Sequence, residues 1–368
     1  MNDFYIYQKE DWPNFKWDSE ILLPILSDVR ILQGKLLGKM ESLGFELREE
    51  ANLKTLTIDI IKSTEIEGEI LNPEQVRSSL ARRLGIKVSD MVYSERNVDG
   101  VVDMMLDAIL KFDSPLSRER LDDWHFSLFP TGRSGMFKIL VGQIRDDSTG
   151  PMQVVSGAMG KEKVHYQAPD AGILENELDK FISWFNSDRE IDPILKAGIA
   201  HLWYVTLHPY EDGNGRMTRA LTDMLLTRAD GIKQRFYSMS SQIRLERKEY
   251  YQILERTQTG TLDVTNWLVW FLKCLKNAVE SSSVTLEKVI FKHNFWMKNS
   301  LKIKNDRQKL ILNKLMDDFT GKLNTSKWAK ITKCSNDTAL RDIQDLLEKD
   351  ILEREDGGGR NTSYKIKL

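Results

Sequence analysis

The residues between 208 and 219 combine a titratable imidazole, a carboxylate, glycines and two arginines at close spacing. His208 is the group in this stretch that is suited to taking a proton near neutral pH. Asp212 offers a hard oxygen ligand for Mg²⁺, the usual companion of a polyphosphate. Arg216 and Arg219 are three positions apart, so on a helix both guanidinium groups can reach the same anion. These residue types predict phosphoryl or nucleotidyl transfer to an incoming hydroxyl.

Two helices must place these side chains. The first begins near Pro193, which suits an initial helical position, and ends at His208 because a residue before proline avoids helical geometry. The second begins near Gly215, where unpaired backbone amides and the positive end of the helix dipole attract an anion. Gly213 and Gly215 let the backbone approach a phosphate closely, and Asn214 tolerates the left-handed conformations of such a loop. Helix, glycine-bearing loop and helix together predict an anion site.

Residues 208–219 resemble the signature of the Fic family, His-Pro-Phe-x-(Asp/Glu)-Gly-Asn-Gly-Arg-x-x-Arg. Tyr210 departs from the usual phenylalanine; it keeps the aromatic body but must place its hydroxyl. The wider resemblance covers roughly residues 101–277. It implies a mainly α fold, with a helical Fic core and a small β-hairpin flap.

The resemblance also implies a role for each matching position. His208 would deprotonate the target hydroxyl, Asp212 would hold Mg²⁺, and Arg219 would bind the γ-phosphate. The implied reaction transfers AMP from ATP to a Ser, Thr or Tyr hydroxyl of a protein target and releases pyrophosphate. The implied enzyme is a protein adenylyltransferase, and its remaining phosphate cradle would be formed by Gly213, Asn214, Gly215 and Arg216.

A β-hairpin pattern runs from 152 to 169 around a turn-prone segment at 157–160. It resembles the flap of the family, which pairs with the target backbone as an added strand. The resemblance places target contacts at Val164, His165 and Tyr166, with His165 as a flap surface residue in preference to a second base.

The motif does not include the residues that select the base of the nucleotide. CTP, GTP or another nucleotide therefore stays open as the donor, in addition to ATP. Tyr250 and Tyr251 are candidates for an adenine-packing ring. Ordinary core packing is an equal alternative for either tyrosine.

A short acidic segment upstream, taken alone, has the features of an ordinary acidic helix end. Ser63 and Glu67 are four positions apart on one helical face, and Gly68 suits the helix end. The segment resembles the (Ser/Thr)-x-x-x-Glu-(Gly/Asn) inhibitory motif of Fic proteins whose inhibitory helix precedes the core. By this resemblance, Glu67 would pair bidentately with Arg219 and occupy the place of the γ-phosphate.

The C-terminal segment predicts three helices and a terminal hairpin, which resemble a winged helix-turn-helix. Residues 305–368 hold 13 Lys and Arg against 11 Asp and Glu, a net charge of only +2. Lysines cluster beside the expected recognition helix, where DNA contact is one interpretation. A protein-interaction surface is the other, and the two stay open.

Four ranges summarise the expected organisation: a helical N-terminal domain with the inhibitory helix (1–100), the Fic catalytic domain (101–280), a linker or linking helix (281–304) and the winged-helix-like domain (305–368). Two alternative functions stay open. One is removal of AMP from a modified protein at the same site, and the other is DNA-binding regulation with a nucleotide-sensing Fic core.

Composition limits the remaining classes. Apolar residues make up 41% and charged residues 29%, with a formal charge of −2, which argues against a globally basic nucleic-acid binder. The chain has two cysteines, too few for a disulfide framework, and no long apolar stretch, which predicts a reduced, cytoplasmic protein with no membrane partner. Neither a P-loop motif nor a zincin motif occurs. A homo-oligomer is one of the open assembly states.

Overall fold

The computed structural model describes residues 5–88, 91–148, 150–157, 163–187, 191–316, 319, 321–355 and 362–367. The chain divides into two compact units, residues 1–283 and 284–368. The turn residues predicted at 158–160 and 357–359 lie outside the described residues.

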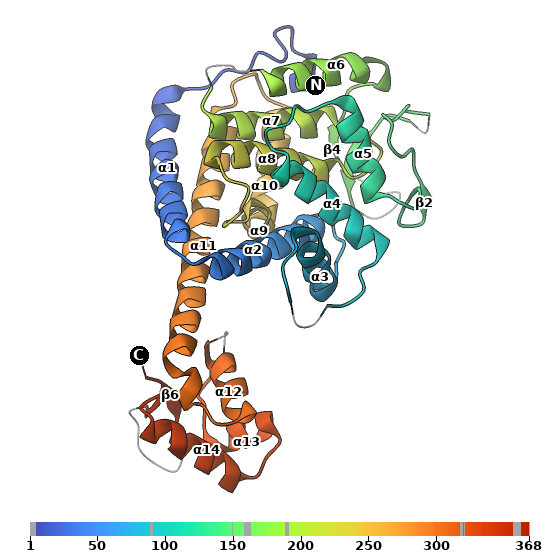
Figure 1. Ribbon diagram of the computed structural model, residues 1–368. Coiled ribbons are helices and arrows are strands. Elements are labelled where there is room, and N and C mark those ends of the chain that lie inside the picture. Colours follow the sequence, from blue (N-terminus) through green and yellow to red (C-terminus); the bar gives the residue numbers. More distant parts are fainter. Residues whose placement is uncertain are drawn as a thin grey trace. The chain divides into compact units, whose positions relative to one another are not determined.

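Unit 1 is mainly helical (Figure 1). Its helices are α1 (Ser19–Glu41), α2 (Phe45–Ile66), α3 (Pro73–Leu84), α4 (Arg96–Leu110), α5 (Arg118–Leu128), α6 (Ala171–Asn186), α7 (Pro193–Leu207), α8 (Asn214–Asp230), α9 (Met239–Leu245), α10 (Arg247–Gln258) and the first part of α11 (Thr265–Asn299). Two antiparallel ladders join β1 (Arg133–Ser134) to β2 (Phe137–Lys138) and β3 (Gln153–Ser156) to β4 (Lys163–Gln167), and η1 (Ile6–Gln8) is a short 3-10 helix.

The centre of unit 1 is the pair α7 and α8, which lie side by side (Figure 1). Every residue of α7 from 194 to 207 is buried, because α6 packs on one side and α8 on the other. A helix that is apolar all round in this way belongs inside a core. The predicted start of this helix at Pro193 is confirmed, and Asp192 caps it by accepting from the Ile194 amide at 2.8 Å. In α8 the expected buried stripe is confirmed for Met217, Ala220, Leu221, Met224 and Leu225.

Helix α2 is anchored along its length by buried polar side chains. The Asp59 carboxylate accepts from the Ser238 hydroxyl and from the Ser240 amide, the latter at 3.2 Å. About two turns earlier, Asn52 Oδ1 accepts from the Arg235 amide at 2.8 Å. Buried polar groups with satisfied partners define one position for an element. The end of α2 near residue 66 is therefore held in a fixed place relative to α8 and α9.

One predicted boundary differs from the structure. The expected division between 1–100 and 101–280 falls inside α4, whose apolar face is buried on both sides of residue 100. In the range 281–304, expected as a linker or linking helix, residues 281–299 are helical and continue α11 without a break. The described residues include no helix with the length and apolarity needed to cross a bilayer, and both cysteines are free thiols.

Unit 2 contains the end of α11, η2 (Ser300–Lys302), α12 (Asp306–Met316), α13 (Thr325–Thr332), α14 (Asn336–Glu348) and the ladder of β5 (Leu352–Arg354) with β6 (Tyr364–Ile366). The three predicted helices and the two predicted strands are all present. Its core is built around Trp328, with Ile311 and Leu312 from α12 and Ala339 and Ile343 from α14.

Candidate active site

The loop between α7 and α8 is closed by two left-handed residues and one side chain. His208 ends α7 with φ 49° and Gly213 precedes α8 with φ 80°. A Cβ on Gly213 would lie 2.9 Å from the Phe129 ring, so glycine is required for space as well as conformation. Asn214 begins α8, and its side-chain amide exchanges hydrogen bonds with the backbone of Tyr210 at 3.0 and 2.7 Å.

His208 is held in the tautomer of a proton acceptor. Its Nδ1 lies 3.2 Å from the carbonyl oxygen of Val205. Because a carbonyl oxygen can only accept, Nδ1 carries the hydrogen and Nε2 keeps its lone pair. Burial lowers the pKa of His208 below its ordinary 6.5, which favours the neutral imidazole near pH 7. The ring is therefore set up to act as a general base.

Arg145 fixes the backbone around His208. Its Nε donates to the His208 carbonyl at 3.0 Å, and its amide donates to the Pro209 carbonyl at 3.1 Å. The same guanidinium contacts Asp147 and the Pro169 carbonyl, and the side chain is buried. One arginine thus ties the catalytic loop to the end of the β3–β4 hairpin.

Arg219 bonds the end of α2 through two of its nitrogens. Its Nε donates to Ser63 Oγ, and its Nη2 donates to the Ser63 carbonyl and to Glu67 Oε1, each at 2.8 Å. The contact predicted between Glu67 and Arg219 is present, and it joins Glu67 Oε1 to Arg219 Nη2. Ser63 takes Nε and shares Nη2 with Glu67, in place of the expected bidentate pair. Gly215 makes room for it, since a Cβ there would lie 2.0 Å from Glu67 Oε1.

Arg216 is buried beside the loop and only partly engaged. Its Nη1 lies 3.1 Å from Glu69 Oε2, and its guanidinium carbon lies 5.0 Å from the centre of the Phe129 ring. Its buried Nε has no hydrogen-bond partner among the described residues. A buried charged donor without a partner is costly. It marks a position where an anion would be stabilised.

The Asp212 carboxylate faces the β1–β2 hairpin. Oδ2 accepts from the Ser134 hydroxyl, and Oδ1 accepts from the Gly213 amide at 2.6 Å. Within the described ranges, no three His, Cys, Asp or Glu side chains gather into a metal cluster. Mg²⁺ is commonly held by one or two carboxylates together with substrate phosphates. Asp212 beside an anion loop fits that kind of site.

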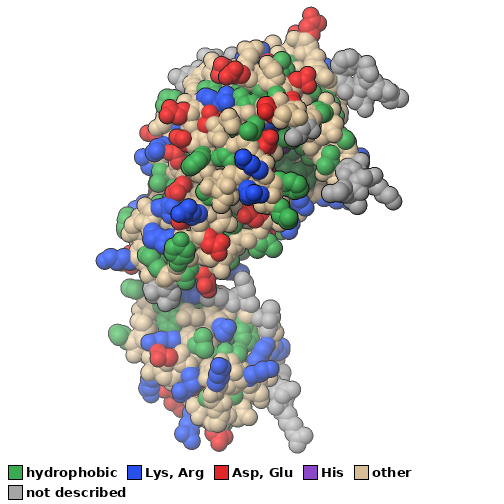
Figure 2. All heavy atoms as spheres, turned by 90° about the vertical axis from the view of Figure 1, so that its right-hand side faces the viewer, with side chains coloured by type: hydrophobic (Ala, Val, Ile, Leu, Met, Phe, Trp, Pro, Cys, Tyr) green, Lys and Arg blue, Asp and Glu red, His purple; other side chains and the backbone are tan. Residues whose placement is uncertain are grey.

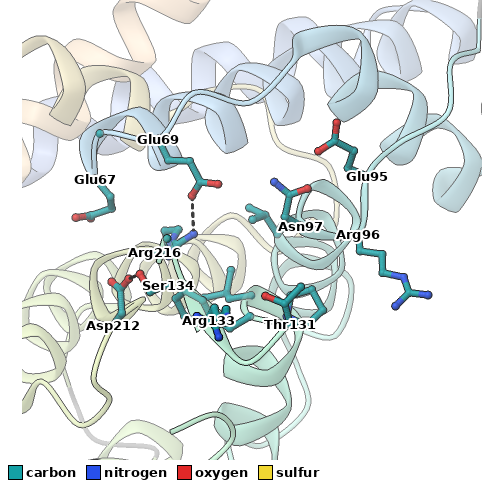
Figure 3. Close-up of a pocket in the computed structure, with 16 residues that line it drawn as sticks. Glu67, Glu69, Glu95, Arg96, Asn97, Thr131, Arg133, Ser134, Asp212 and Arg216 are labelled. Carbon is teal, nitrogen blue, oxygen red and sulfur yellow. Dashed lines mark hydrogen bonds and ion pairs between the residues drawn. The ribbon is translucent and has the colours of Figure 1, made fainter. Parts of the chain in front are cut away.

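A cavity of about 680 Å³ opens next to the loop (Figure 3). The segment after α2, the start of α4, the end of α5, β1 and the loop line it. Glu67 and Glu69 point from the segment after α2 toward Arg216 and Asp212, whereas Arg96 extends away from them. The cavity therefore lies beside both the unpaired donor and the candidate metal ligand.

Tyr210 and His125 form the floor beneath the loop. The Tyr210 hydroxyl, which must find a partner when buried, donates to Asp122 Oδ1 at 2.7 Å. Its ring stacks on His125 with centres 4.3 Å apart. His125 accepts from the Gly142 amide and donates from Nε2 to the Asp212 carbonyl at 3.2 Å, while burial lowers its pKa to about 4. The departure from phenylalanine is accommodated by a neutral histidine and one carboxylate.

Comparison with known proteins finds matches over parts of the chain. Residues 115–226 match the family model described as Fic/DOC family, and residues 5–86 match the model described as a domain of unknown function, DUF4172.

The chain contains a Fic domain.

Curated relatives and solved structures agree with the Fic domain. The protein adenylyltransferase Fic of Drosophila mojavensis is 29% identical over 114 residues, which are 30% of this chain and 21% of that protein. The corresponding protein of Drosophila grimshawi is also 29% identical over 114 residues, covering 30% of this chain and 22% of its own length. The match therefore spans about a fifth of these relatives.

Two crystal structures show the fold. A Fic family protein from Desulfovibrio desulfuricans G20 superposes with a TM-score of 0.51 at 18% identity, over 94% of this chain and 95% of that one. A Fic domain containing signaling protein from Bacteroides thetaiotaomicron gives a TM-score of 0.52 at 20% identity, over 72% of this chain and 95% of the other. The mainly helical Fic fold predicted from the motif is thus confirmed.

The two tyrosines predicted near the base of a nucleotide differ in exposure. Tyr250 is buried, and its hydroxyl and His201 Nε2 are 2.9 Å apart, with Thr222 on the other side of the imidazole. Tyr250 therefore belongs to the core. Tyr251 is 37% exposed and stacks at an angle on Tyr250, with Arg247 over its ring. Of the two, Tyr251 is the one whose ring is open to a ligand.

The flap ladder pairs β3 with β4, and its three predicted contact residues differ in exposure. Val164 is exposed, whereas Tyr166 is buried and its hydroxyl donates to the Thr206 carbonyl at 2.6 Å. Tyr166 therefore belongs to the core through its side chain, and only its backbone is left for the strand pairing that the resemblance implies. His165 lies 2.6 Å from Ser156 Oγ and 3.0 Å from Glu255 Oε2, which makes it a surface residue of the hairpin.

Several residues of the site were missed in the sequence. Arg145 and Ser134 reach the loop from segments without periodicity or a motif, and His125 reaches it from the buried face of α5. Glu69 is different, because it follows Glu67 by two positions and Gly68 has the positive φ of 87° that lets the chain turn between them. An acidic residue just beyond a helix-ending glycine was the signal that could have identified it.

Proposed function

We propose that this chain transfers AMP from ATP to a Ser, Thr or Tyr hydroxyl of a protein target and that Glu67 inhibits the reaction. The observation that carries the proposal is the neutral His208 with a free Nε2 beside an anion loop containing two buried arginines. The Drosophila relatives named protein adenylyltransferase support the same reaction class.

The proposed chemistry begins at His208. Nε2 accepts the proton of the target hydroxyl while the hydroxyl oxygen forms a bond to the α-phosphorus of ATP. The bond from the α-phosphorus to its bridging oxygen breaks, and pyrophosphate leaves. No covalent bond to the protein forms, so the rate depends on positioning and charge stabilisation.

Phosphate binding falls to the start of α8. The backbone amides of Gly213 to Gly215 lie at the positive end of a 17-residue helix, and the unpaired Arg216 Nε lies beside them. Asp212 would hold Mg²⁺, which would supply positive charge between the phosphates. Ser134 would orient the Asp212 carboxylate through the hydrogen bond that already joins them.

Inhibition follows from the occupation of Arg219. A γ-phosphate needs the guanidinium that now bonds Ser63 and Glu67. The 2.0 Å approach of Glu67 Oε1 to the position of a Gly215 Cβ means that the carboxylate also fills space above the α8 amides. ATP that binds beside Glu67 would therefore have its phosphates out of line for attack.

The target would dock on the flap. Among the described residues, β3 and β4 pair only with each other, which leaves an outer strand edge able to accept a peptide strand. The exposed side chains of Val155 and Val164 would give apolar contact to such a strand.

One labelling experiment tests the proposal. Parent, Glu67→Gly and His208→Ala proteins are incubated with Mg²⁺ and ATP labelled at the α-phosphate, with a cell extract as the source of targets. We expect protein-bound label that increases in Glu67→Gly and is lost in His208→Ala. ATP labelled at the γ-phosphate serves as the control and should leave no label beyond that found with the extract alone.

Other outcomes overturn the proposal. Transfer of γ-label would indicate a kinase reaction at the loop. Glu67-dependent loss of label from a pre-modified target, with no incorporation in any variant, would indicate AMP removal instead. Absence of label in every variant would leave the loop as a nucleotide-binding device without transfer.

A further inference from the structure

Helices α13 and α14 of unit 2 form a rigid helix-turn-helix pair. They are joined by Lys333, Cys334 and Ser335, with Lys333 in the left-handed conformation at φ 52°. Ser335 Oγ caps α14 by accepting from the Thr338 amide at 3.2 Å. Trp328 of α13 and Ile343 of α14 share one buried core. A turn of three to four residues between two helices is the geometry with which many proteins set a helix into the DNA major groove.

The solvent face of α14 carries side chains that read base edges. Asn336, Arg341 and Gln344 are exposed, and none has a side-chain partner among the described residues. Amide and guanidinium groups form bidentate bonds with adenine and guanine, respectively. Leu340 is the one large apolar side chain of these two helices that is exposed, at 39%. A protein-binding surface would need a broader apolar centre than this.

The acidic residues of α14 repel DNA less than the net charge of residues 305–368 suggests. Asp342 accepts from Arg307 Nε at 2.8 Å and from Asn305. Asp345 accepts from Lys304 Nζ at 2.8 Å and pairs with Lys349. Both carboxylates are thus neutralised inside unit 2. Asp337 and Glu348 remain exposed on the helix.

Two cations stand at the turn without such partners. Lys330 ends the last turn of α13 and Lys333 forms the corner, and both are exposed with no ion pair among the described residues. Lys and Arg predominate among the charged side chains on the face of unit 2 that Figure 2 turns to the viewer. Lysines on the helix that precedes a recognition helix are placed to contact phosphates on either side of the groove.

From these observations we propose that unit 2 binds double-stranded DNA through α13 and α14. Lys330 and Lys333 contact backbone phosphates, and α14 enters the major groove with Arg341, Asn336 and Gln344 at base edges. This binding is independent of the proposed transfer reaction, because it needs neither nucleotide nor His208. It would give the chain a nucleic-acid partner in addition to its protein target.

The test uses the full chain and a fluorescent mixed-sequence duplex of about 20 base pairs, two turns of DNA. Fluorescence anisotropy is measured between about 50 and 200 mM KCl. We expect the double variant Lys330→Gln/Lys333→Gln to bind about 10- to 100-fold more weakly at about 100 mM salt and to lower the salt slope by about 2, the loss of two phosphate contacts. Arg341→Ala should weaken binding and reduce discrimination between duplexes of different sequence.

The matched control is Lys309→Gln/Lys367→Gln, which removes the same charge from lysines paired with Asp306 and Asp350. It should bind like the parent, with circular dichroism showing that all variants are folded. Failure of the parent to bind at about 50 mM salt overturns the proposal. So does an equal loss in the control pair, or tighter binding of single-stranded RNA of the same length.

Discussion

The two arginines at the start of α8 meet two carboxylates in different ways. Arg219 bonds Glu67 at 2.8 Å and is also held by the side chain and backbone of Ser63. Arg216 bonds Glu69 at 3.1 Å, and its Nε has no partner within the part of the chain that the structure describes. Glu67 is 32% exposed and Glu69 is 44% exposed at the side chain. The end of α2 thus bonds Arg219 through both Nε and Nη2, whereas Arg216 keeps a buried Nε available to a ligand.

Because of this difference, we expect Glu67 to compete strongly with a nucleotide for its arginine and Glu69 to compete weakly. A charge-assisted bond in a water-poor site is worth more than the same bond at the surface, because solvent competes less. A nucleotide must displace Glu67 to use Arg219, but it can share Arg216 with Glu69. We therefore expect the two glutamates to differ in their effect on activity, and the following experiments test that expectation.

The largest effect should come from the base in a released enzyme. In a Glu67→Gly background, adding His208→Ala removes the proton acceptor and should lower AMP incorporation by about 10²–10⁴-fold. The measurement is the initial rate with α-labelled ATP. If the rate of the double variant equals that of Glu67→Gly, the increase in incorporation on loss of Glu67 does not depend on His208.

Release of Arg219 should come next. Glu67→Gly removes a charge-assisted bond worth about 1.5–3 kcal/mol and should raise incorporation by about 10- to 100-fold. Glu65→Gln is the matched control, because Glu65 ends the same helix but pairs with Lys62 and Arg244. Equal rates of incorporation in Glu67→Gly and the parent protein would show that Glu67 does not inhibit the reaction.

Substitution of the two glutamates should change the pKa of His208 by different amounts. The difference should reach up to about one pKa unit, which is a tenfold change in proton affinity. Burial is the main cause of its lowered pKa, and the negative charge of Glu67 opposes that shift. Glu67→Gly should therefore lower the pKa of His208 further, and a base with a lower pKa stays active to lower pH. Glu69→Gln should leave it at the parent value.

An NMR titration of the histidine ring protons measures this shift, and the His208→Ala spectrum assigns the signal among the five histidines. A higher pKa in Glu67→Gly than in the parent would contradict the expected sign.

The smallest effect belongs to Glu69. Glu69→Gln should raise incorporation only about two- to fivefold, since a partly exposed pair contributes about 0.2–1 kcal/mol. Glu95→Gln is the control, because Glu95 lines the same cavity but accepts from Gln75 instead of Arg216. A gain as large as that of Glu67→Gly would show that the two pairs are equivalent.

Sequence reasoning identified the parts of the candidate site whose residues are close together in the chain. The residues from His208 to Arg219 lie on one loop and one helical turn, so their proximity follows from local geometry. Glu67 was reachable for the same reason, since it stands four positions from Ser63 at a helix end marked by Gly68.

The supporting residues were out of reach because they depend on tertiary packing. Arg145 and Ser134 come from irregular segments 63 and 78 positions from their partners in the loop. The burial of Tyr166 and Tyr250 likewise depends on Thr206 and His201 of α7, which no local pattern connects to them. Where contacts cross the whole unit, residue type alone does not choose between a core role and a ligand role.

The buried anchors of α2 have a consequence for any competitor of Glu67. Asp59 and Asn52 fix the helix, and Glu67 follows directly after it, so the carboxylate is in effect a tethered ligand of Arg219. Short tethers give effective concentrations in the millimolar range or above, about 10⁻³ M at least. An untethered anion reaches Arg219 only at comparable concentration or by binding through several groups at once. A triphosphate, which also engages the α8 amides and Arg216, satisfies the second condition where a free phosphate does not.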